Sequence, residues 1–191
     1  MTSPLDARPI IVAIAGPNGA GKSTFYEAFI AQAGLRYVNT DDVARTLRVD
    51  AYEAAELAET LRQQLASERE SFVFETVFSD PTGGKVAFLE QAAQDGYTVV
   101  LCFIGLAAAQ ASDDRVAMRV LQGGHDVPPD KITARYPRSL ANLARATKRL
   151  PLVWVYDNSD LAEPFRKVMQ WEGGVVAWRA ELVPEWCPKG G

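Results

Sequence analysis

Several common features are scarce or missing in this 191-residue sequence. It has two cysteines, Cys102 in an apolar run and Cys187 near the C-terminus, and neither belongs to a metal-ligand spacing. A single disulfide would be unusual in a chain of this length, so we expect reduced cysteines and a cytoplasmic protein. Residues 1–8 show no signal-peptide core, and no apolar run approaches the ~20 residues of a transmembrane helix, so no membrane partner is expected.

A basic excess is also missing, since the formal net charge is −4 at pH 7. Nucleic-acid-binding domains usually carry a basic field, so we expect no nucleic-acid partner, although a local basic pocket is compatible with this charge. Internal repeats, low-complexity segments and Pro/Gly-rich linkers are absent too. Apolar residues make up 48% of the sequence, which predicts a single domain over residues 1–191 with its own core.

The most informative stretch follows the pattern G-x-x-x-x-G-K-[S/T]. Residues 9–15 before it are apolar and β-branched, as in a buried parallel strand, and residues 25–33 after it indicate a helix that ends at Gly34. Strand, glycine loop and helix in this order are the context of a phosphate-binding P-loop. The predicted nucleotide-binding residues are Gly16, Pro17, Asn18, Gly19, Ala20, Gly21, Lys22, Ser23 and Thr24.

The chemistry of this loop predicts ATP and Mg²⁺ as cofactors. Its glycines let successive backbone N–H groups converge on phosphate oxygens, and the helix N-terminus adds partial positive charge. Lys22 is expected to reach the β- and γ-phosphates, and the Ser23 hydroxyl to ligate Mg²⁺.

Acidic residues follow the short strand expected at 35–39. Ligands of open parallel sheets bind beyond the carboxyl ends of the strands, so Asp41 or Asp42 is a candidate to accept the proton of an acceptor hydroxyl. Thr40 or Asp41 is equally suitable as the N-cap of a helix at 43–47, and the sequence leaves both roles open. An amphipathic helix is expected next, at 52–70.

Glu75 and Thr76 lie near the end of the strand expected at 71–78, and we favour a role in substrate binding for them. Glu75 would bind a substrate hydroxyl, orient Asp41 or hold a metal-bound water, the alternative being a surface glutamate. A helix at 85–95 precedes the strand expected at 97–105, which lacks the terminal aspartate of a Walker B strand. That absence fits small-molecule kinases better than motor ATPases or GTPases.

Residues 107–149 are expected to form a lid of two helices joined by a glycine-containing loop that includes His125, the sole histidine. Arg115 and Arg119 lie one turn apart on the first helix, and Arg135 and Arg138 lie on the second, which begins at residue 130. Guanidinium groups suit phosphate contacts and can neutralise charge on the transferring group. The alternative is a set of exposed arginines paired with neighbouring acids.

The strand expected at 150–156 leads to Asp157, Asn158 and Ser159, which would read a purine edge or simply form a turn. A helix at 161–169, a strand at 174–179 and a loosely packed tail at 179–191 complete the prediction. The tryptophans of this region are interpreted as packing residues.

Together these segments resemble the zeta-toxin-like P-loop kinases, above all a short bacterial branch. The resemblance rests on N-T-D at 39–41, F-E-T at 74–76, G-G-H-D-V-P at 123–128, R-Y-P-R-S-L at 135–140 and Y-D-N-S at 156–159. Well-described members phosphorylate the 3′-hydroxyl of UDP-N-acetylglucosamine. The long toxins carry additional substrate-binding segments, and this chain is shorter than they are.

The resemblance implies a role for each matching residue. Asp41 would be the base and Glu75 a substrate ligand. Arg115 or Arg119, together with Arg135, would contact the ATP phosphates, and residues 157–159 would lie beside adenine. An antitoxin protein is the implied partner.

We therefore expect a three-layer α/β sandwich of the P-loop NTPase type, with a parallel five-stranded sheet and a helical lid. Its strand order, 2-3-1-4-5, is implied by the resemblance, whereas alternating strands and helices indicate the parallel sheet. The predicted function is ATP- and Mg²⁺-dependent phosphoryl transfer to a hydroxyl of a small molecule such as a UDP-amino sugar. The alternative is a nucleotide-binding switch or slow ATPase that acts through a protein partner.

Overall fold

The computed structural model describes residues 3–109, 111 and 128–190. The predicted site residues Arg115 and Arg119, with His125 and most of the first lid helix, lie outside the described residues. Among the described residues, no helix combines the length and apolar character needed to cross a membrane.

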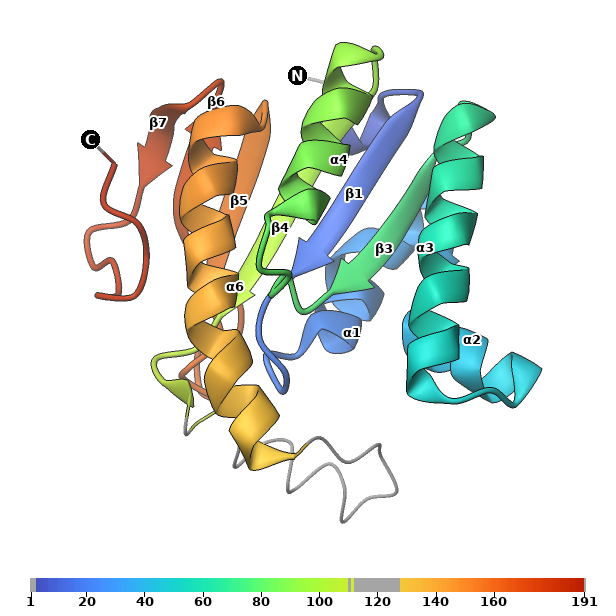
Figure 1. The fold of residues 1–191 in the computed structure, drawn as a ribbon. Helices are drawn as coiled ribbons and strands as arrows, with labels where there is room; N and C mark the ends of the chain where they lie inside the picture. The colour runs from blue at the N-terminus through green and yellow to red at the C-terminus, as the bar shows by residue number, and fades with distance from the viewer. Residues whose placement is uncertain (1–2, 110, 112–127, 191) are drawn as a thin grey trace.

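A seven-stranded sheet in the order β2-β3-β1-β4-β5-β6-β7 forms the centre of the protein (Figure 1). The first five strands of the chain pair in parallel and in the predicted order, whereas β6 and β7 are antiparallel. The strands are β1 (Ile10–Ala15), β2 (Arg36–Val38), β3 (Phe72–Thr76), β4 (Thr98–Gly105), β5 (Leu152–Asp157), β6 (Arg166–Glu172) and β7 (Val175–Arg179).

The prediction of a purely parallel, five-stranded sheet was therefore wrong, as was the helix at 161–169, because residues 166–172 form β6. Gly173 and Gly174 have φ angles of 55° and 83° between β6 and β7. Two successive positive φ angles are what a tight two-residue hairpin turn requires. This Gly-Gly turn joins the two strands into a hairpin that extends the sheet beyond β5.

Two helical layers cover the sheet (Figure 1). Helices α3, α4 and α6 pack on one face, and the segment that follows the P-loop packs on the other. The helical elements are η1 (Pro4–Asp6), α1 (Lys22–Phe25), η2 (Tyr26–Ile30), η3 (Ala31–Ala33), α2 (Thr40–Leu47), α3 (Ala51–Ser67), α4 (Gly84–Gln94) and α6 (Pro129–Arg149). The arrangement is the predicted three-layer α/β sandwich.

The helix predicted at 25–33 is irregular in the structure. It begins as α-helix in α1, continues as a π-helical turn in η2 and ends as 3-10 helix in η3. Gly34 closes it in the left-handed conformation, with φ of 64°, as predicted for a C-terminal glycine. Tyr26, the first residue of the π turn, stacks its ring on that of Tyr37, with centroids 3.8 Å apart and planes 3° from parallel.

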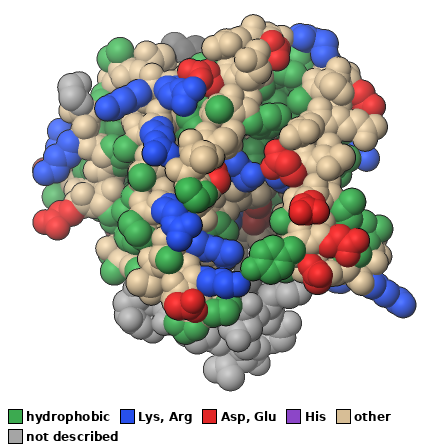
Figure 2. Space-filling view, viewed as in Figure 1, with side chains coloured by type: hydrophobic (Ala, Val, Ile, Leu, Met, Phe, Trp, Pro, Cys, Tyr) green, Lys and Arg blue, Asp and Glu red, His purple; other side chains and the backbone are tan. Residues whose placement is uncertain are grey.

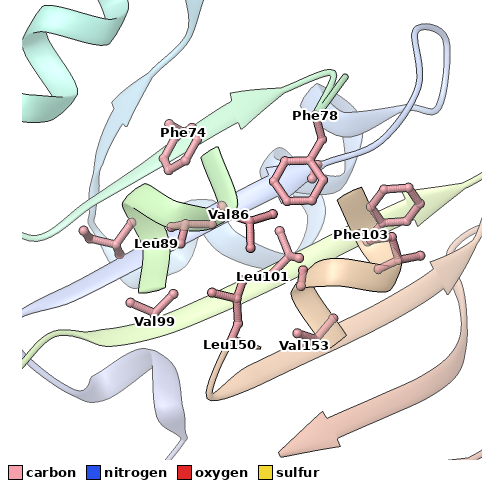
Figure 3. Close-up of a cluster of buried hydrophobic side chains, with 14 of the residues drawn as sticks. Phe74, Phe78, Val86, Leu89, Val99, Leu101, Phe103, Leu150 and Val153 are labelled. Carbon is pink, nitrogen blue, oxygen red and sulfur yellow. The ribbon is translucent and has the colours of Figure 1, made fainter. Parts of the chain in front are cut away.

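Strand β1 is buried along its whole length, which explains its unbroken apolar sequence. Its odd-numbered residues face a core with α3, α4 and α6, part of which Figure 3 shows around Phe74, Leu89 and Leu101. Its even-numbered residues face a second core that includes Phe25 and Ile30. Burial on both faces fixes the strand, and with it the start of the P-loop.

The sequence predicts a loosely packed tail at 179–191, but two residues of this segment pack against the rest of the protein. Cys187 is buried, and the Trp186 ring lies 6.3 Å from that of Phe103. A Cβ atom at Gly105, the last residue of β4, would lie 2.1 Å from the Trp186 ring. Both cysteines are free, and burial raises the pKa of each thiol to about 12.

Candidate active site

The glycine-rich loop connects β1 to α1 at the carboxyl edge of the parallel strands. Gly16 has φ of 146°, and a Cβ there would lie 2.1 Å from the carbonyl oxygen of Ile104. Its N–H donates a hydrogen bond to the Thr76 carbonyl at 3.2 Å. This bond holds the start of the loop against the end of β3. Gly21, with φ of 87°, is the N-cap of α1. Both glycines occupy backbone conformations that a side chain would strain.

The Lys22 ammonium lies over this loop. Its Nζ donates hydrogen bonds to the carbonyls of Gly16 at 3.1 Å and Pro17 at 3.0 Å. These contacts hold the positive charge at the start of the loop, beside the N-terminus of α1. Backbone amides, a helix N-terminus and an ammonium are together the elements of a phosphate cradle.

Asn158 anchors the P-loop to the exit of β5. Its Nδ2 donates to the Ala20 carbonyl at 2.9 Å, its Oδ1 accepts from the Phe165 N–H at 3.3 Å, and its own N–H donates to the Gly105 carbonyl at 3.0 Å. Asp157 Oδ1 accepts from the Ser159 N–H and hydroxyl. The turn-forming interpretation of residues 157–159 thus describes these contacts, and adenine binding by them stays a prediction.

Glu75 lies at the centre of a hydrogen-bond network between β3, β2 and the P-loop. Its Oε2 accepts from the Ser23 hydroxyl at 3.2 Å, and its Oε1 accepts from the Tyr37 hydroxyl, which also accepts from Asn39 Nδ2 at 2.9 Å. Burial, together with the hydrogen bond to Glu75 and its charge, raises the pKa of Tyr37. Tyr37 therefore stays protonated and donates to the carboxylate. Sequence analysis missed Tyr37, a half-buried residue of β2.

Asp41 lies in the first turn of α2. The structure assigns the N-cap to Asn39, whose Oδ1 accepts from the Asp41 N–H at 2.8 Å, so capping by Thr40 or Asp41 was wrong. The Asp41 side chain is not used as the cap, and Asp41 lines the cleft described next. Its neighbour Asp42 forms an exposed ion pair with Arg45 at 3.0 Å.

A cleft of about 560 Å³ opens at this edge of the sheet. Figure 2 shows the face hollowed between α6 and α3. The predicted residues that line it are Asn18, Gly19, Gly21, Lys22, Ser23, Thr24, Asp41, Glu75, Thr76 and Arg135. The predicted residues that do not line it are Gly16, Pro17, Ala20, Asp157, Asn158 and Ser159. Arg62 and Lys85 line it too, although the sequence analysis assigned neither residue a role.

Helix α6 brings Arg135 to the cleft. Ser139 Oγ donates to the Val77 carbonyl at 2.5 Å, and Asn142 Nδ2 donates to the Phe78 and Asp80 carbonyls, each at 2.9 Å. These bonds fix the helix to the loop after β3. Figure 2 shows Lys and Arg side chains along α6. Arg138 does not line the cleft, and its Nε donates to the Ala134 carbonyl at 3.0 Å.

Oxygen donors in the cleft fit Mg²⁺. The Ser23 hydroxyl and the Glu75 carboxylate are hard ligands only 3.2 Å apart, and Mg²⁺ in kinases is typically held by one or two protein oxygens plus substrate phosphates. Within the described part of the chain, no cluster of three or more His, Cys, Asp or Glu side chains forms an all-protein metal site. The donors therefore suit a metal that arrives with a nucleotide.

The fold and this cleft define a P-loop kinase-type α/β protein. Residues 31–168 match the family model of the zeta toxins, and the chain belongs to the zeta toxin family. The family and fold support a P-loop kinase with nucleotide binding, and they leave the substrate unspecified.

Solved structures and a curated protein resemble the chain. A chain of the AvrRxo1-ORF1:AvrRxo1-ORF2 complex with sulphate ions has a TM-score of 0.60 at 18% identity, over 90% of this chain and 61% of that one. A chain of the PezAT toxin–antitoxin system of Streptococcus pneumoniae has a TM-score of 0.56 at 15% identity, over 85% and 72%. A cytidylate kinase of Chlorobaculum tepidum is 43% identical over 47 residues, 25% of this chain and 20% of the relative. The chain thus spans a fifth of that relative and about three fifths of the AvrRxo1 chain.

Proposed function

We propose that the protein transfers the γ-phosphoryl group of ATP to a hydroxyl of a small molecule. The observation that carries the proposal is that one cleft is lined by Lys22 and Ser23 of the P-loop, by Asp41 and Glu75, and by Arg135. Phosphoryl transfer needs positive charges for the phosphates, a carboxylate to accept a proton, and oxygen atoms that can hold Mg²⁺. Lys22 and Arg135, then Asp41, then Ser23 and Glu75 are suited to these roles.

The residues divide the reaction between them. The loop amides and Lys22 bind the β- and γ-phosphates, and Ser23, oriented by Glu75, would hold Mg²⁺. Bound Mg²⁺ supplies charge neutralisation on the phosphates. Asp41 accepts the proton of the acceptor hydroxyl. The hydroxyl oxygen bonds to the γ-phosphorus as the bond between that phosphorus and the β,γ-bridging oxygen breaks, and ADP is the leaving group. Arg135 stabilises the charge that develops on the transferring group.

The family suggests an acceptor and a partner. We propose a nucleotide sugar of the UDP-amino sugar type as the acceptor and an antitoxin as the protein partner. Membership of the zeta toxin family supports the acceptor, and the fold shared with a chain of the PezAT toxin–antitoxin system supports the partner. On this proposal the adenine lies on the side of residues 157–159, and Arg115 or Arg119 assists Arg135.

The decisive experiment measures ADP release with ATP·Mg²⁺ in the presence and absence of a metabolite pool that contains UDP-N-acetylglucosamine, with mass spectrometry to identify the product. We expect acceptor-dependent ADP release, reduced about 10²- to 10⁴-fold in Asp41→Asn because the general base is lost. Asp42→Asn, which removes the neighbouring exposed carboxylate, is the matched control and should keep the wild-type rate. Acceptor-independent ADP release that survives Asp41→Asn would instead identify a slow ATPase or switch.

A further inference from the structure

Two cations in the cleft have no role in the proposed handling of ATP. Arg62 projects from α3 and Lys85 from α4, and both line the same cleft as Asp41 and Glu75. Lys22 and Arg135 come from the P-loop and α6, so the α3–α4 wall carries a separate positive pair.

One carboxylate serves both of these cations. Glu59 Oε2 accepts from Arg62 Nη2 at 2.5 Å and from Lys85 Nζ at 2.9 Å. Burial alone would raise the pKa of Glu59, but the hydrogen bonds from Lys85 and Arg62 outweigh it and hold the pKa at about 2. Glu59 is therefore ionised at neutral pH, and two positive charges against one negative leave the cluster with a net charge of +1.

Arg62 is a buried cation with unused donors. It is 4% exposed, and its Cζ lies 5.1 Å from the centroid of the Phe74 ring. Of its three guanidinium nitrogens, only Nη2 has a hydrogen-bond partner among the described residues. A guanidinium carries five N–H donors, and a buried charge that is not fully paired is costly. The cleft therefore presents an incompletely satisfied arginine to whatever enters it.

If Arg62 and Lys85 served only to stabilise the fold, two cations opposite Glu59 would not be needed. One cation opposite Glu59 would be enough to tie α3 to α4, and that cation would not need to line a cleft. The guanidinium fork matches the planar geometry of carboxylate and phosphate oxygens, and a lysine beside it adds a point charge.

We infer that Arg62 and Lys85 form a subsite for an anionic group, a carboxylate or a phosphate, on the molecule that accepts the phosphoryl group. The inference rests on the proposed function and narrows it. The acceptor is then a hydroxyl compound with a negative charge at a distance from the reacting hydroxyl, and neutral sugars and alcohols are poor substrates. Part of its binding energy comes from α3 and α4, away from the P-loop.

The test uses calorimetric titration of sodium phosphate, and separately of sodium acetate, into the protein saturated with a non-hydrolysable ATP analogue and Mg²⁺. The analogue occupies the P-loop, so we expect one further anion to bind. Arg62→Met and Lys85→Met should each weaken it by about tenfold or more, the usual effect of losing a charge-assisted hydrogen bond. Affinity for the analogue should stay nearly unchanged. Preference for phosphate or acetate identifies the anionic group.

Arg45→Met is the matched control, because Arg45 is an exposed cation of α2 whose side chain is 73% exposed. It should leave anion binding unchanged. Lys85, with a side chain 28% exposed, can be replaced with less risk to folding than Arg62, and thermal unfolding checks both variants. Absence of a second anion, or equal anion affinity in Arg62→Met, Lys85→Met and Arg45→Met, would overturn the inference.

Failure of the proposed function would look different. If the analogue does not bind, ATP-dependent transfer is ruled out, and the anion titration is then read on the nucleotide-free protein. In the nucleotide-free protein, anion binding that is weakened by Arg62→Met and Lys85→Met supports the subsite. Anion binding that is unchanged in both variants contradicts it.

Discussion

The Ser23 hydroxyl donates a hydrogen bond to Glu75 Oε2 at 3.2 Å. This bond places the carboxylate beside the P-loop at the end of β3, the direct neighbour of β1, where Glu75 pairs in register with Ile14. The strand on the other side of β1 is β4, whose last residue is Gly105. β4 lacks the terminal aspartate of a Walker B strand, and β3, on the opposite side of β1, supplies Glu75 instead.

Replacement of Glu75 should change the response to magnesium. In Glu75→Gln we expect about a tenfold higher Mg²⁺ concentration for half-maximal ADP release, because the charge opposite Ser23 is removed. Initial rates measured across a Mg²⁺ series give this value. Tyr37→Phe is the companion variant, since it removes the donor to Oε1 but keeps the charge, and should shift the midpoint less. An unchanged midpoint in Glu75→Gln would separate Glu75 from the metal.

Loss of the P-loop ammonium should weaken nucleotide binding. Lys22→Met removes the charge that lies over the loop beside Gly16 and Pro17. We expect affinity for ATP·Mg²⁺ to fall by about tenfold or more, as for other charge-assisted phosphate contacts, when measured by calorimetry. Lys148→Met, which removes an exposed lysine of α6, should bind ATP·Mg²⁺ like the wild type. Equal affinity of both variants would disprove the role of Lys22.

The Asn158 anchor should contribute both to stability and to nucleotide binding. Asn158→Ala leaves the Ala20 carbonyl without its donor and should lower the free energy of unfolding by about 1–3 kcal/mol, measured by urea denaturation. Affinity for ATP·Mg²⁺ should fall as well, because the loop loses its support. Asn158→Asp keeps the acceptor for the Phe165 N–H but loses the donor to Ala20. Because its carboxylate also adds a negative charge beside the P-loop, Asn158→Asp should lower the affinity at least as much as Asn158→Ala, and wild-type affinity in Asn158→Ala would contradict the role of the Ala20 bond.

We expect the cluster of Glu59, Arg62 and Lys85 to make the stability of the protein depend on pH. The pKa of Glu59 is about 2 in the folded protein, below the ordinary value of 4.5. Its contribution is therefore complete above about pH 4.5 and is lost as the pH falls toward 2, where the carboxylate takes up a proton. Denaturation midpoints at pH 6 and pH 3 should differ less in Glu59→Gln than in wild type. Glu56→Gln, on the exposed part of α3, should keep the wild-type difference.

The contact between β4 and the C-terminal segment can be tested by enlarging the side chain at residue 105. In Gly105→Ala the new methyl group would collide with the Trp186 ring, and overpacking of this kind costs about 1–3 kcal/mol. We expect lower stability and a red shift of tryptophan emission as the ring is displaced. In a Trp186→Ala background the same change should cost much less. Additive effects of the two substitutions would contradict a direct collision.

The sequence predicted the parts of the structure that depend on local patterns. The P-loop, the five parallel strands and Gly34 as a helix terminus all follow from short motifs and apolar runs. The strand predicted at 174–179 corresponds to β7, whereas β6 was missed because residues 161–169 contain a helix-compatible mixture and the deciding Gly173-Gly174 turn lies beyond them. Contacts across the sheet, such as Tyr37 with Glu75, depend on strand register and could not be predicted from either segment alone.

The residues of the cleft likewise divide into those that a local sequence pattern predicts and those that only the fold brings there. Asp41 and Glu75 were predicted as candidates because they lie near the ends of strands, and Arg135 because it lies on the expected lid helix. Arg62 could not be recognised, because an arginine in an Ala- and Glu-rich helix has the sequence appearance of a solvated residue. Only the packing of α3 against Phe74 and α4 buries it at 4% exposure.

The π turn of η2 has a consequence for how this chain tolerates insertions and deletions. Removal of one residue between Tyr26 and Ile30 would restore α-helical spacing, but it would rotate the following residues by about 100° around the axis. Ile30 would leave the second core, and Gly34 would no longer fall at the left-handed position that turns the chain toward β2. The segment length between the P-loop and β2 is therefore fixed to the single residue, whereas the individual side chains along its exposed side remain free to vary.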